Sequence, residues 1–297
     1  MNQKRWLTRN LPSLAGKTVA VTGATGGLGR EICRGILTLG GSLILLARNP
    51  RKLEQLKLSL LEEFPGSCIR GVMADLSDLQ SVSRACRQLL TLEPDILVHN
   101  AGAYKIPRKT CSTGLDNVFQ INFASPYYMT RQLLPMLSRR RGKVVVMGSV
   151  ACSYSLSDPG DPDFHTRSRC HLVYGNSKRY LMFAFSRLMA RWPQVDFAIA
   201  HPGITVTAIT AHYPKPLYAL IRYPMKIIFM HPPAAARGML RAICQPVPPG
   251  FWMGPRFFRV WGNPAVSPLP RCNRAEQQAM DAQAQRLYAE MMQSECV

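Results

Sequence analysis

Two kinds of apolar pattern alternate along the first two thirds of the chain, and this alternation constrains the fold more than any other feature. Residues 18–24, TVAVTGA, form a short β-branched run that ends in glycine, as a buried parallel strand does. Residues 28–39 follow with the spacing of a helix. The same alternation predicts strands at 42–47, 69–75, 95–102, 143–149 and 196–203, and helices at 50–64 and 81–90. It predicts an α/β fold with a doubly wound parallel sheet of about six strands.

The pattern changes from about residue 204 onward. Residues 216–230 are apolar with basic interruptions, and residues 234–244 again have helical spacing. The tail from Phe251 is rich in proline, arginine and aromatic residues, and a helix is predicted near 274–293. The sequence has no linker and no internal repeat. We therefore expect one domain over residues 1–297, with residues 204–297 as a C-terminal extension within it.

The net charge of +20 at pH 7 is the unusual compositional feature. It favours nucleic acid, an anionic membrane surface or anionic small molecules as partners. No recognisable nucleic-acid module accompanies the basic residues, so no specific nucleic-acid partner is expected. The sequence also has no apolar run of roughly eighteen residues that could span a membrane, and no secretory signal.

The nine cysteines are irregularly spaced and include no C-x-x-C pair. This pattern is typical of free thiols in a reducing compartment rather than of a disulfide framework or a zinc site. We expect a cytoplasmic protein without a metal site, and we leave open its attachment to a membrane surface.

The stretch TGATGGLG, residues 22–29, lies between the first predicted strand and the first predicted helix. Glycines here permit a tight turn, close approach of a pyrophosphate and close helix packing. The free N–H groups of the following helix would face that anion. An ordinary glycine-rich turn is the alternative. The residues predicted to bind the cofactor in this loop are Gly23, Thr25, Gly27, Leu28 and Gly29.

The end of the second predicted strand bears on which dinucleotide is bound. A carboxylate there would bind a ribose 2′-hydroxyl, whereas a cation would bind a 2′-phosphate. The sequence reads LLARNPRK and places Arg48 at the strand end. The planar guanidinium is suited to phosphate, so we expect NADP(H) in preference to NAD(H), which remains an alternative. Arg51 and Lys52 are equally consistent with solvated cations at a helix start.

With these features the chain resembles the short-chain dehydrogenase/reductase superfamily, whose fold is a Rossmann-type sheet. The match runs in order over roughly residues 15–210 and is nearest to the retinol-dehydrogenase-like branch. It consists of TGATGGLG, ADL (74–76), HNAG (99–102), Asn122, Ser149, Tyr174-x-x-x-Lys178 and HPGITVT (201–207).

The resemblance implies further contacts with the cofactor. Asp75 would bind the adenine edge beside Leu76, although Asp75 could instead only cap a helix. Thr207 is the candidate for the nicotinamide carboxamide, with Thr205 as an alternative. The remaining implied residues are Asn100, Ala101 and Gly102 at the adenine ribose, and Pro202 and Gly203 at the nicotinamide.

The resemblance also implies catalytic roles. Tyr174 would exchange a proton with the substrate oxygen, and Lys178 would favour its phenolate and hold the nicotinamide ribose. Ser149 would hydrogen-bond the substrate oxygen. Asn122 would hold a water on a proton path to Lys178. Ser149 could instead cap a strand end, Asn122 could cap a helix, and Ser125 could take the place of Asn122.

On the substrate side, Cys152 is expected to line the pocket without acting as a nucleophile. Residues 216–230 would form a lid over a hydrophobic alcohol or carbonyl such as a retinoid, a steroid or a long-chain compound. The same segment could be an internal packing helix, or could dock on an anionic bilayer. The sequence thus predicts an oxidoreductase, with a non-catalytic dinucleotide-binding regulatory or scaffold protein as the alternative. A homodimer would pair through the helices around FQINFASPYYMTRQLLPML and SKRYLMFAFSRLMA.

Overall fold

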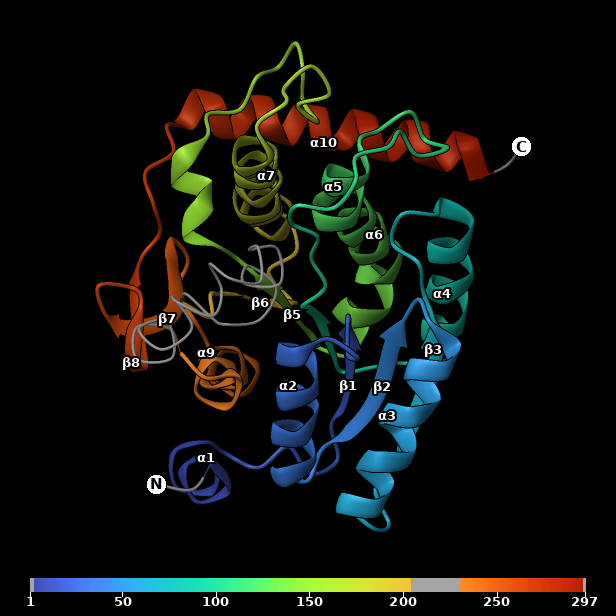
Figure 1. The fold of residues 1–297 in the computed structure, drawn as a ribbon, viewed down its shortest axis with the longest axis vertical. Coiled ribbons are helices and arrows are strands. Elements are labelled where there is room, and N and C mark those ends of the chain that lie inside the picture. The colour runs from blue at the N-terminus through green and yellow to red at the C-terminus, as the bar shows by residue number, and fades with distance from the viewer. Residues whose placement is uncertain (1–2, 204–229, 296–297) are drawn as a thin grey trace, which may run out of the picture.

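The computed structural model describes residues 3–203 and 230–295. Its centre is one eight-stranded sheet with the order β3-β2-β1-β4-β5-β6-β7-β8. Strands β1 to β7 are parallel and β8 is antiparallel to β7 (Figure 1). The strands are β1 Thr18–Thr22, β2 Ser42–Ala47, β3 Ile69–Met73, β4 Ile96–His99, β5 Lys143–Met147, β6 Asp196–Ala200, β7 Phe251–Phe257 and β8 Trp261–Pro268.

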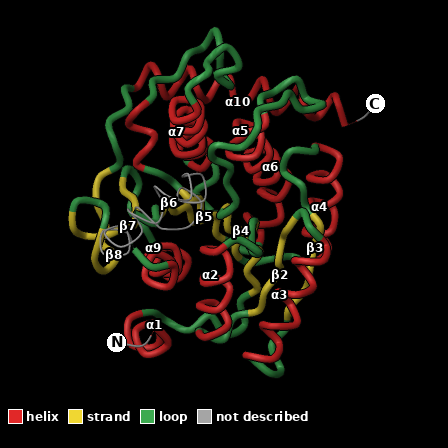
Figure 2. The backbone as a smooth tube through the Cα atoms, viewed as in Figure 1, coloured by secondary structure: helices red, strands yellow, loops and turns green. Residues whose placement is uncertain are grey.

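Helices cover both faces of the sheet, which confirms the predicted doubly wound architecture (Figure 2). Helices α1, α2, α3 and α9 pack on one face, and α4, α6, α7 and α10 pack on the other. Their bounds are α1 Gln3–Asn10, α2 Gly27–Thr38, α3 Pro50–Glu63, α4 Leu79–Leu92, α6 Ser125–Arg139, α7 Cys170–Met189, α9 Pro232–Cys244 and α10 Arg274–Glu295. The shorter elements are α5 Asn117–Phe119, the π-helix η1 Gln120–Ala124 and the 3₁₀ helix η2 Val150–Tyr154.

The central strands are apolar on both sides because both sides are covered. In β1 the side chain of Ala20 belongs to one core, whereas Val19 and Val21 belong to the other. Val21 pairs with Leu45 of β2 and with Val98 of β4. This two-sided burial explains why the parallel strands are continuous apolar runs rather than alternating ones.

The last two strands depart from the sequence expectation, which described the tail from Phe251 by composition alone. β7 hydrogen-bonds β6 beside Ala200 and forms a hairpin with β8. Prolines interrupt both strands, and Pro255 and Pro264 stand opposite each other. Proline cannot donate to a ladder, so it is tolerated near the edge of a sheet, where β7 and β8 lie. Because this hairpin continues the same sheet, we propose that residues 1–297 form one domain.

The structure extends the expected C-terminal helices slightly and adds one at the N-terminus. α10 crosses the outer sides of α7 and α6, and α1 packs beside α9 (Figure 1). The predicted segment 216–230 lies outside the described residues except for Met230. Within the described ranges, no helix is both long and apolar enough to cross a bilayer.

Candidate active site

A cleft of about 670 Å³ opens at the carboxyl ends of the parallel strands, where the strand order reverses between β1 and β4. Ligands of doubly wound sheets bind at such a point, and the volume is typical of a small-molecule site. Asn122 does not line the cleft, and Thr207 lies outside the described residues. The predicted site residues that line it are Gly23, Thr25, Gly27, Leu28, Gly29, Arg48, Asp75, Leu76, Asn100, Ala101, Gly102, Ser149, Tyr174, Lys178, Pro202 and Gly203.

The glycine-rich loop makes one wall of the cleft. Gly23 has a φ of +64°, and a Cβ there would lie 2.8 Å from the Cα of Ala101, so only glycine fits. Gly26, which the sequence reading did not select, precedes α2 and places no side-chain cap on it. The first N–H groups of α2 are therefore available to an anion in the cleft.

Asn100 fastens this loop to β4. Its Nδ2 donates to the carbonyl oxygens of Thr22 (3.0 Å) and Gly23 (3.2 Å). The Thr22 hydroxyl accepts from the backbone N–H groups of Asn100 and Ala101, both at 3.1 Å. Thr22 is a supporting residue that the sequence reading missed, although it stands at the end of the first predicted strand.

Arg48 and Asp75 lie at the other end of the cleft, after β2 and β3. Arg48 is exposed, and the neighbouring Asn49 caps α3 by accepting from Lys52 N at 3.0 Å. Asp75 Oδ1 accepts from both the N–H and the hydroxyl of Ser77, at 2.9 and 2.8 Å. Asp78, not Asp75, is the N-cap of α4. The cap alternative for Asp75 is therefore wrong, and its role toward the adenine stays a prediction.

Tyr174 is half-buried and faces Ser149 across the cleft. A hydrogen bond joins the Ser149 side chain to Tyr174, and Ser149 Oγ also accepts from Ala151 N at 3.2 Å as the cap of η2. Tyr104 packs edge-on against the Tyr174 ring with centroids 5.0 Å apart. Burial raises the pKa of Tyr174, and the hydrogen bond with Ser149 opposes that rise only in part. The phenol is therefore neutral at neutral pH.

Gly175 allows this pairing because it brings α7 close to η2. A Cβ at Gly175 would lie 2.5 Å from the Ala151 carbonyl oxygen and 2.8 Å from Ser155 Oγ. Any larger residue would push α7 away from η2. The glycine after Tyr174 thus holds the phenol within reach of Ser149.

Lys178 lies one helical turn after Tyr174 and is 1% exposed. Its Nζ donates to the Met147 carbonyl oxygen at 2.9 Å and lies 5.8 Å from the centre of the Tyr174 ring. Burial lowers the pKa of Lys178 to about 8. The ammonium therefore remains mostly protonated at pH 7 and supplies positive charge behind the phenol.

Asn122 lies in the π-helix behind the cleft. Its amide donates to Ala103 O (2.9 Å) and Ser177 Oγ (2.9 Å), and accepts from Ala103 N (2.7 Å). Gly102 lies between Asn122 and Lys178, because a Cβ there would be 3.4 Å from Asn122 Oδ1 and 3.5 Å from Lys178 Nζ. The N-caps of α5, η1 and α6 are Asp116, Phe119 and Ala124, so Asn122 is not the cap of any of these helices. Its role on a proton path stays a prediction.

Arg179, the residue after Lys178, ties the floor of the site to the C-terminal helix. It is 3% exposed and makes a two-pronged ion pair with Glu276 of α10, at 2.5 and 2.6 Å. Arg179 Nη1 also donates to Cys152 O of η2 at 3.1 Å. Glu276 Oε1 accepts from the N–H and hydroxyl of Ser157, both at 3.0 Å. One buried ion pair thus holds the segment after Ser149 against α7 and α10.

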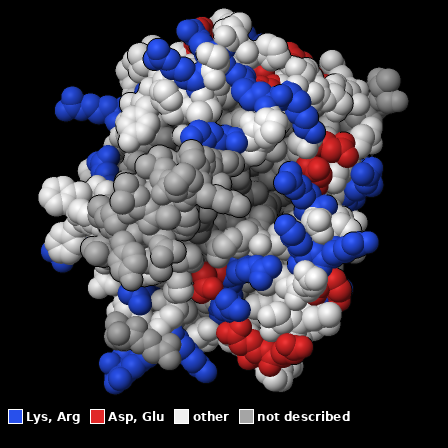
Figure 3. Space-filling model, in the orientation of Figure 1, with Lys and Arg blue, Asp and Glu red and all other residues white. Residues whose placement is uncertain are grey.

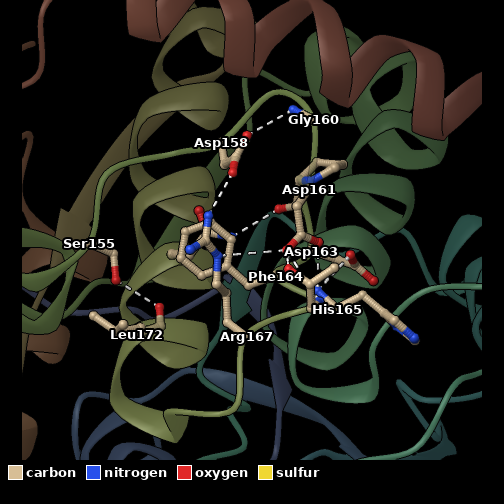
Figure 4. Close-up of polar contacts among 12 residues, drawn as sticks. Ser155, Asp158, Gly160, Asp161, Asp163, Phe164, His165, Arg167 and Leu172 are labelled. Carbon is tan, nitrogen blue, oxygen red and sulfur yellow. Dashed lines mark hydrogen bonds and ion pairs between the residues drawn. The ribbon is translucent and has the colours of Figure 1, made fainter.

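The long stretch between Ser149 and Tyr174 contains a loop folded by its own aspartates (Figure 4). Ser155 Oγ donates to Leu172 O at 2.7 Å and closes the base of the loop. Asp158 accepts from Gly160 N at 3.0 Å and from Arg167 Nη2 at 2.9 Å. Asp161 accepts from His165 N at 2.7 Å. These bonds order a segment that has no regular secondary structure.

Several residues at the open end of the cleft were not predicted. They line the cleft together with Tyr174 and are largely aromatic or aliphatic. His171 could have been found, because it stands three residues before Tyr174 on the same helix face. The residues are Tyr104, Ile106, Ile121, Tyr154 and His171.

The expectation that Cys152 lines the pocket is wrong. Its side chain is 0% exposed and belongs to the core below η2. Burial raises the pKa of Cys152 to about 11, so the thiol is protonated and inert at neutral pH.

Comparison with known proteins agrees with this geometry. A family model described as "short chain dehydrogenase" matches residues 17–216. Retinol dehydrogenase 14 of Homo sapiens is 30% identical over 235 residues, which cover 70% of this chain and 69% of that protein. The crystal structure of an uncharacterized protein from Mycobacterium paratuberculosis matches with a TM-score of 0.74 and 25% identity, over 95% of this chain and 96% of that one. The Pseudomonas aeruginosa RhlG/NADP active-site complex matches with a TM-score of 0.60 and 26% identity, over 78% and 91% of the two chains.

Proposed function

The chain belongs to the short-chain dehydrogenase family of NAD(P)-dependent oxidoreductases, and from this premise we propose that it interconverts a hydrophobic alcohol and its carbonyl with NADP(H). The observation that carries the proposal is the convergence of Ser149, Tyr174 and Lys178 at one cleft that also holds the glycine-rich loop. Each of the three side chains has a chemical task there.

In the direction of carbonyl reduction, Tyr174 is the proton donor. Its raised pKa keeps the phenol protonated, and Ser149 would hold the substrate oxygen next to it. The charge of Lys178 stabilises the phenolate that remains after proton transfer. We propose that Asn122 and a water return the proton by way of Lys178.

The dinucleotide, when bound, supplies or accepts the hydride. Residues of the cleft fit it: the uncapped start of α2 suits the pyrophosphate, and Arg48 at the end of β2 suits a 2′-phosphate. The Pseudomonas aeruginosa relative was solved with NADP, which supports the same preference here.

A hydrophobic substrate is supported by the side chains at the open end of the cleft. Tyr104, which contacts the Tyr174 ring, and Ile106 and Tyr154 give the cleft aromatic and aliphatic lining. The name of the human relative, retinol dehydrogenase 14, points to the same class of substrate. We therefore propose an aliphatic or polyene alcohol or carbonyl rather than a sugar.

The predicted homodimer through α6 and α7 stays a prediction. α10 lies across both helices: the guanidinium of Arg131 stacks 4.1 Å from the Tyr288 ring, and Gln132 donates to the Tyr288 hydroxyl at 3.0 Å. Pairing through these faces would have to include α10 or displace it.

The direct test is to follow NADPH absorbance with a panel of hydrophobic aldehydes and ketones. We expect turnover by the natural sequence, and a loss of kcat of about 10² to 10⁴ in Tyr174→Phe. Tyr174→Phe should still bind NADPH, because it removes only the hydroxyl.

Two results would count against the proposal. Tight NADPH binding without turnover of any carbonyl would favour the regulatory or scaffold alternative. Equal turnover by the natural sequence and Tyr174→Phe would remove Tyr174 from the chemistry.

A further inference from the structure

Carboxylates are unevenly distributed along this basic chain. The sequence has no Asp or Glu from Met1 to Arg30, and none from Phe197 to Ala275. The described parts of these two stretches include α1, α9, β7 and β8. The net charge of +20 is therefore concentrated in particular elements rather than spread evenly.

The fold brings these acid-free elements together. Arg237 of α9 donates to Gln3 of α1 at 2.9 Å and to Asn263 of β8 at 3.5 Å. Its guanidinium lies 4.7 Å from the ring of Trp6. Figure 1 shows α1, α9 and the β7–β8 hairpin along one side of the molecule. In Figure 3 the coloured side chains visible along the left margin of the view are blue and white.

The β7–β8 hairpin carries large apolar side chains at its tip. Phe258 is 86% exposed and Phe257 is 56% exposed, values that few large apolar side chains reach in a folded protein. Trp261 lies edge-on to Phe258 with centroids 6.0 Å apart. Arg256 and Arg259 stand on either side of Phe257 and Phe258 in the sequence. Arg256 is exposed, whereas the Arg259 guanidinium lies 5.4 Å from the centre of the Trp252 ring and donates to Pro268 O at 3.3 Å.

The turn at this tip uses residues that suit it poorly. Val260 N donates to Phe257 O at 2.9 Å, and the two central residues, Phe258 and Arg259, have φ values of +50° and +60°. Three residues, Phe258 to Val260, connect the strands, and a β-turn with positive φ at both central positions is dominated by Gly, Asn and Asp. Phe and Arg at these positions each lower the stability of the fold by roughly 1–2 kcal/mol, so folding does not explain their presence there.

We propose that this hairpin tip, with the acid-free face around it, docks the protein on an anionic lipid bilayer. Aromatic rings insert favourably at the headgroup level, and arginines pair with lipid phosphates. A second copy of the chain fits the surface less well, because two acid-free basic faces would repel each other.

The position of the tip connects docking to the cleft. The Val260 carbonyl oxygen lies 2.7 Å from where a Cβ on Gly203 would stand, and Gly203 lines the cleft. The docked hairpin therefore places the bilayer surface next to the cleft wall. This is the arrangement that a membrane-dissolved substrate would need, but docking itself does not depend on the proposed reaction.

The test is co-sedimentation with phosphatidylcholine vesicles, with and without phosphatidylserine. We expect binding only when phosphatidylserine is present, and weaker binding at higher salt. Phe258→Asn combined with Arg259→Gly should weaken binding on the order of a hundredfold. Asn and Gly suit the positive φ values of the turn, but Arg259→Gly also removes a hydrogen bond to Pro268 O and a contact with the Trp252 ring. The melting temperature of the variant is therefore measured, and vesicle binding is compared at a temperature at which the variant is folded.

The matched control removes one exposed leucine of α3 and one exposed arginine of β3, at the opposite edge of the sheet from β8. This variant, Leu58→Asn with Arg70→Thr, should bind as the natural sequence does. Three results would overturn the proposal. The first is unchanged vesicle binding by the tip variant. The second is duplex DNA binding that the tip variant loses in parallel with vesicle binding, which would indicate a nucleic-acid surface. The third is a dimer that the tip variant converts to a monomer.

Discussion

Lys178 shows how function and stability compete at a single residue. Its ammonium is 1% exposed and pairs with a neutral carbonyl rather than with a carboxylate. Burial lowers its pKa from 10.5 to about 8, so the folded protein holds the charge less favourably than the unfolded chain does. That difference corresponds to about 3 kcal/mol of lost stability at pH 7.

We therefore expect Lys178→Met to abolish turnover and to raise the free energy of unfolding at pH 7. The folded pKa lies below the unfolded one, so the cost of the lysine is complete below pH 8 and is relieved as the pH rises to 10.5. The gain from the substitution should shrink over that window and vanish above it. Urea denaturation of the natural sequence and of Lys178→Met measures the gain in unfolding free energy at pH 7 and its disappearance above pH 10.

The control for this prediction is Lys143→Met. Lys143 is also buried, but its Nζ pairs with Asp196 at 2.7 Å and donates to Gln245 O at 2.8 Å. Its removal should lower stability at pH 7. If Lys178→Met also lowers stability there, the buried charge is not the cost we assign to it.

Arg48 decides cofactor preference if it binds the 2′-phosphate. Arg48→Ser should weaken NADPH binding by about tenfold to a hundredfold, the range for a charge-assisted hydrogen bond, and leave NADH binding nearly unchanged. Arg51→Ser is the matched control, because Arg51 is exposed at the start of α3 and does not line the cleft. Titration of each variant with NADPH and with NADH measures these affinities. An equal loss of NADPH affinity in the two variants would contradict a specific role for Arg48.

Site residues were predictable from sequence where a local motif fixes them. Tyr174 and Lys178 share a helix face, and Ser149 follows a strand, but the ordered match to the short-chain dehydrogenase family, not periodicity, identified the three together. Tyr104 reaches the same cleft from a loop, and Tyr154 is the last residue of the short 3₁₀ helix η2. The positions of loops and of single 3₁₀ turns follow from tertiary contacts that no periodicity encodes, which is why these two were missed.

At the scale of elements, the ion pair between α7 and α10 is the contact to test. Burial by itself would raise the pKa of Glu276, but the hydrogen bonds from Arg179 and Ser157 overcome it and lower that pKa to about 2. Glu276→Gln leaves Arg179 buried without its charge partner, which should cost about 3–5 kcal/mol of unfolding free energy. Replacing both residues with methionine should recover most of the loss.

The matched control is Glu63→Gln, which breaks an ion pair with Arg34 of similar length, 2.7 Å, between side chains 44% and 38% exposed. An exposed pair contributes about 0–1 kcal/mol, so this variant should unfold nearly as the natural sequence does. Urea denaturation of both variants at pH 7 compares them. Equal destabilisation would contradict the role given to the α7–α10 pair.

Some strands were predictable from sequence and others were not, because their sequences favour a strand to different degrees. The β-branched runs of β1 and β5 predicted strands correctly because burial on both faces leaves a continuous apolar signal. β7 and β8 carry prolines and arginines, and their pairing depends on being near the edge of the sheet. Their edge position is a property of the assembled sheet, so composition could not reveal it.

At the scale of the whole molecule, the fold determines where on the surface the net positive charge lies. The value of +20 was visible in the sequence, as was the absence of acids from two long stretches. The sequence does not show that α9 contacts both α1 and the β7–β8 hairpin, because α1 and the hairpin are separated by most of the chain. Contacts such as Arg237 with Gln3 and Asn263 turn two separate stretches into one surface.

The strand order also determines how the sheet can assemble during synthesis. β1 and β2 pair first, β3 joins β2, and every later strand joins the edge left by its predecessor, from β4 beside β1 to β8 beside β7. No strand has to insert between two others that are already paired. A chain leaving the ribosome can therefore extend its sheet strand by strand, and the half that contains the glycine-rich loop is complete long before the C-terminal hairpin emerges.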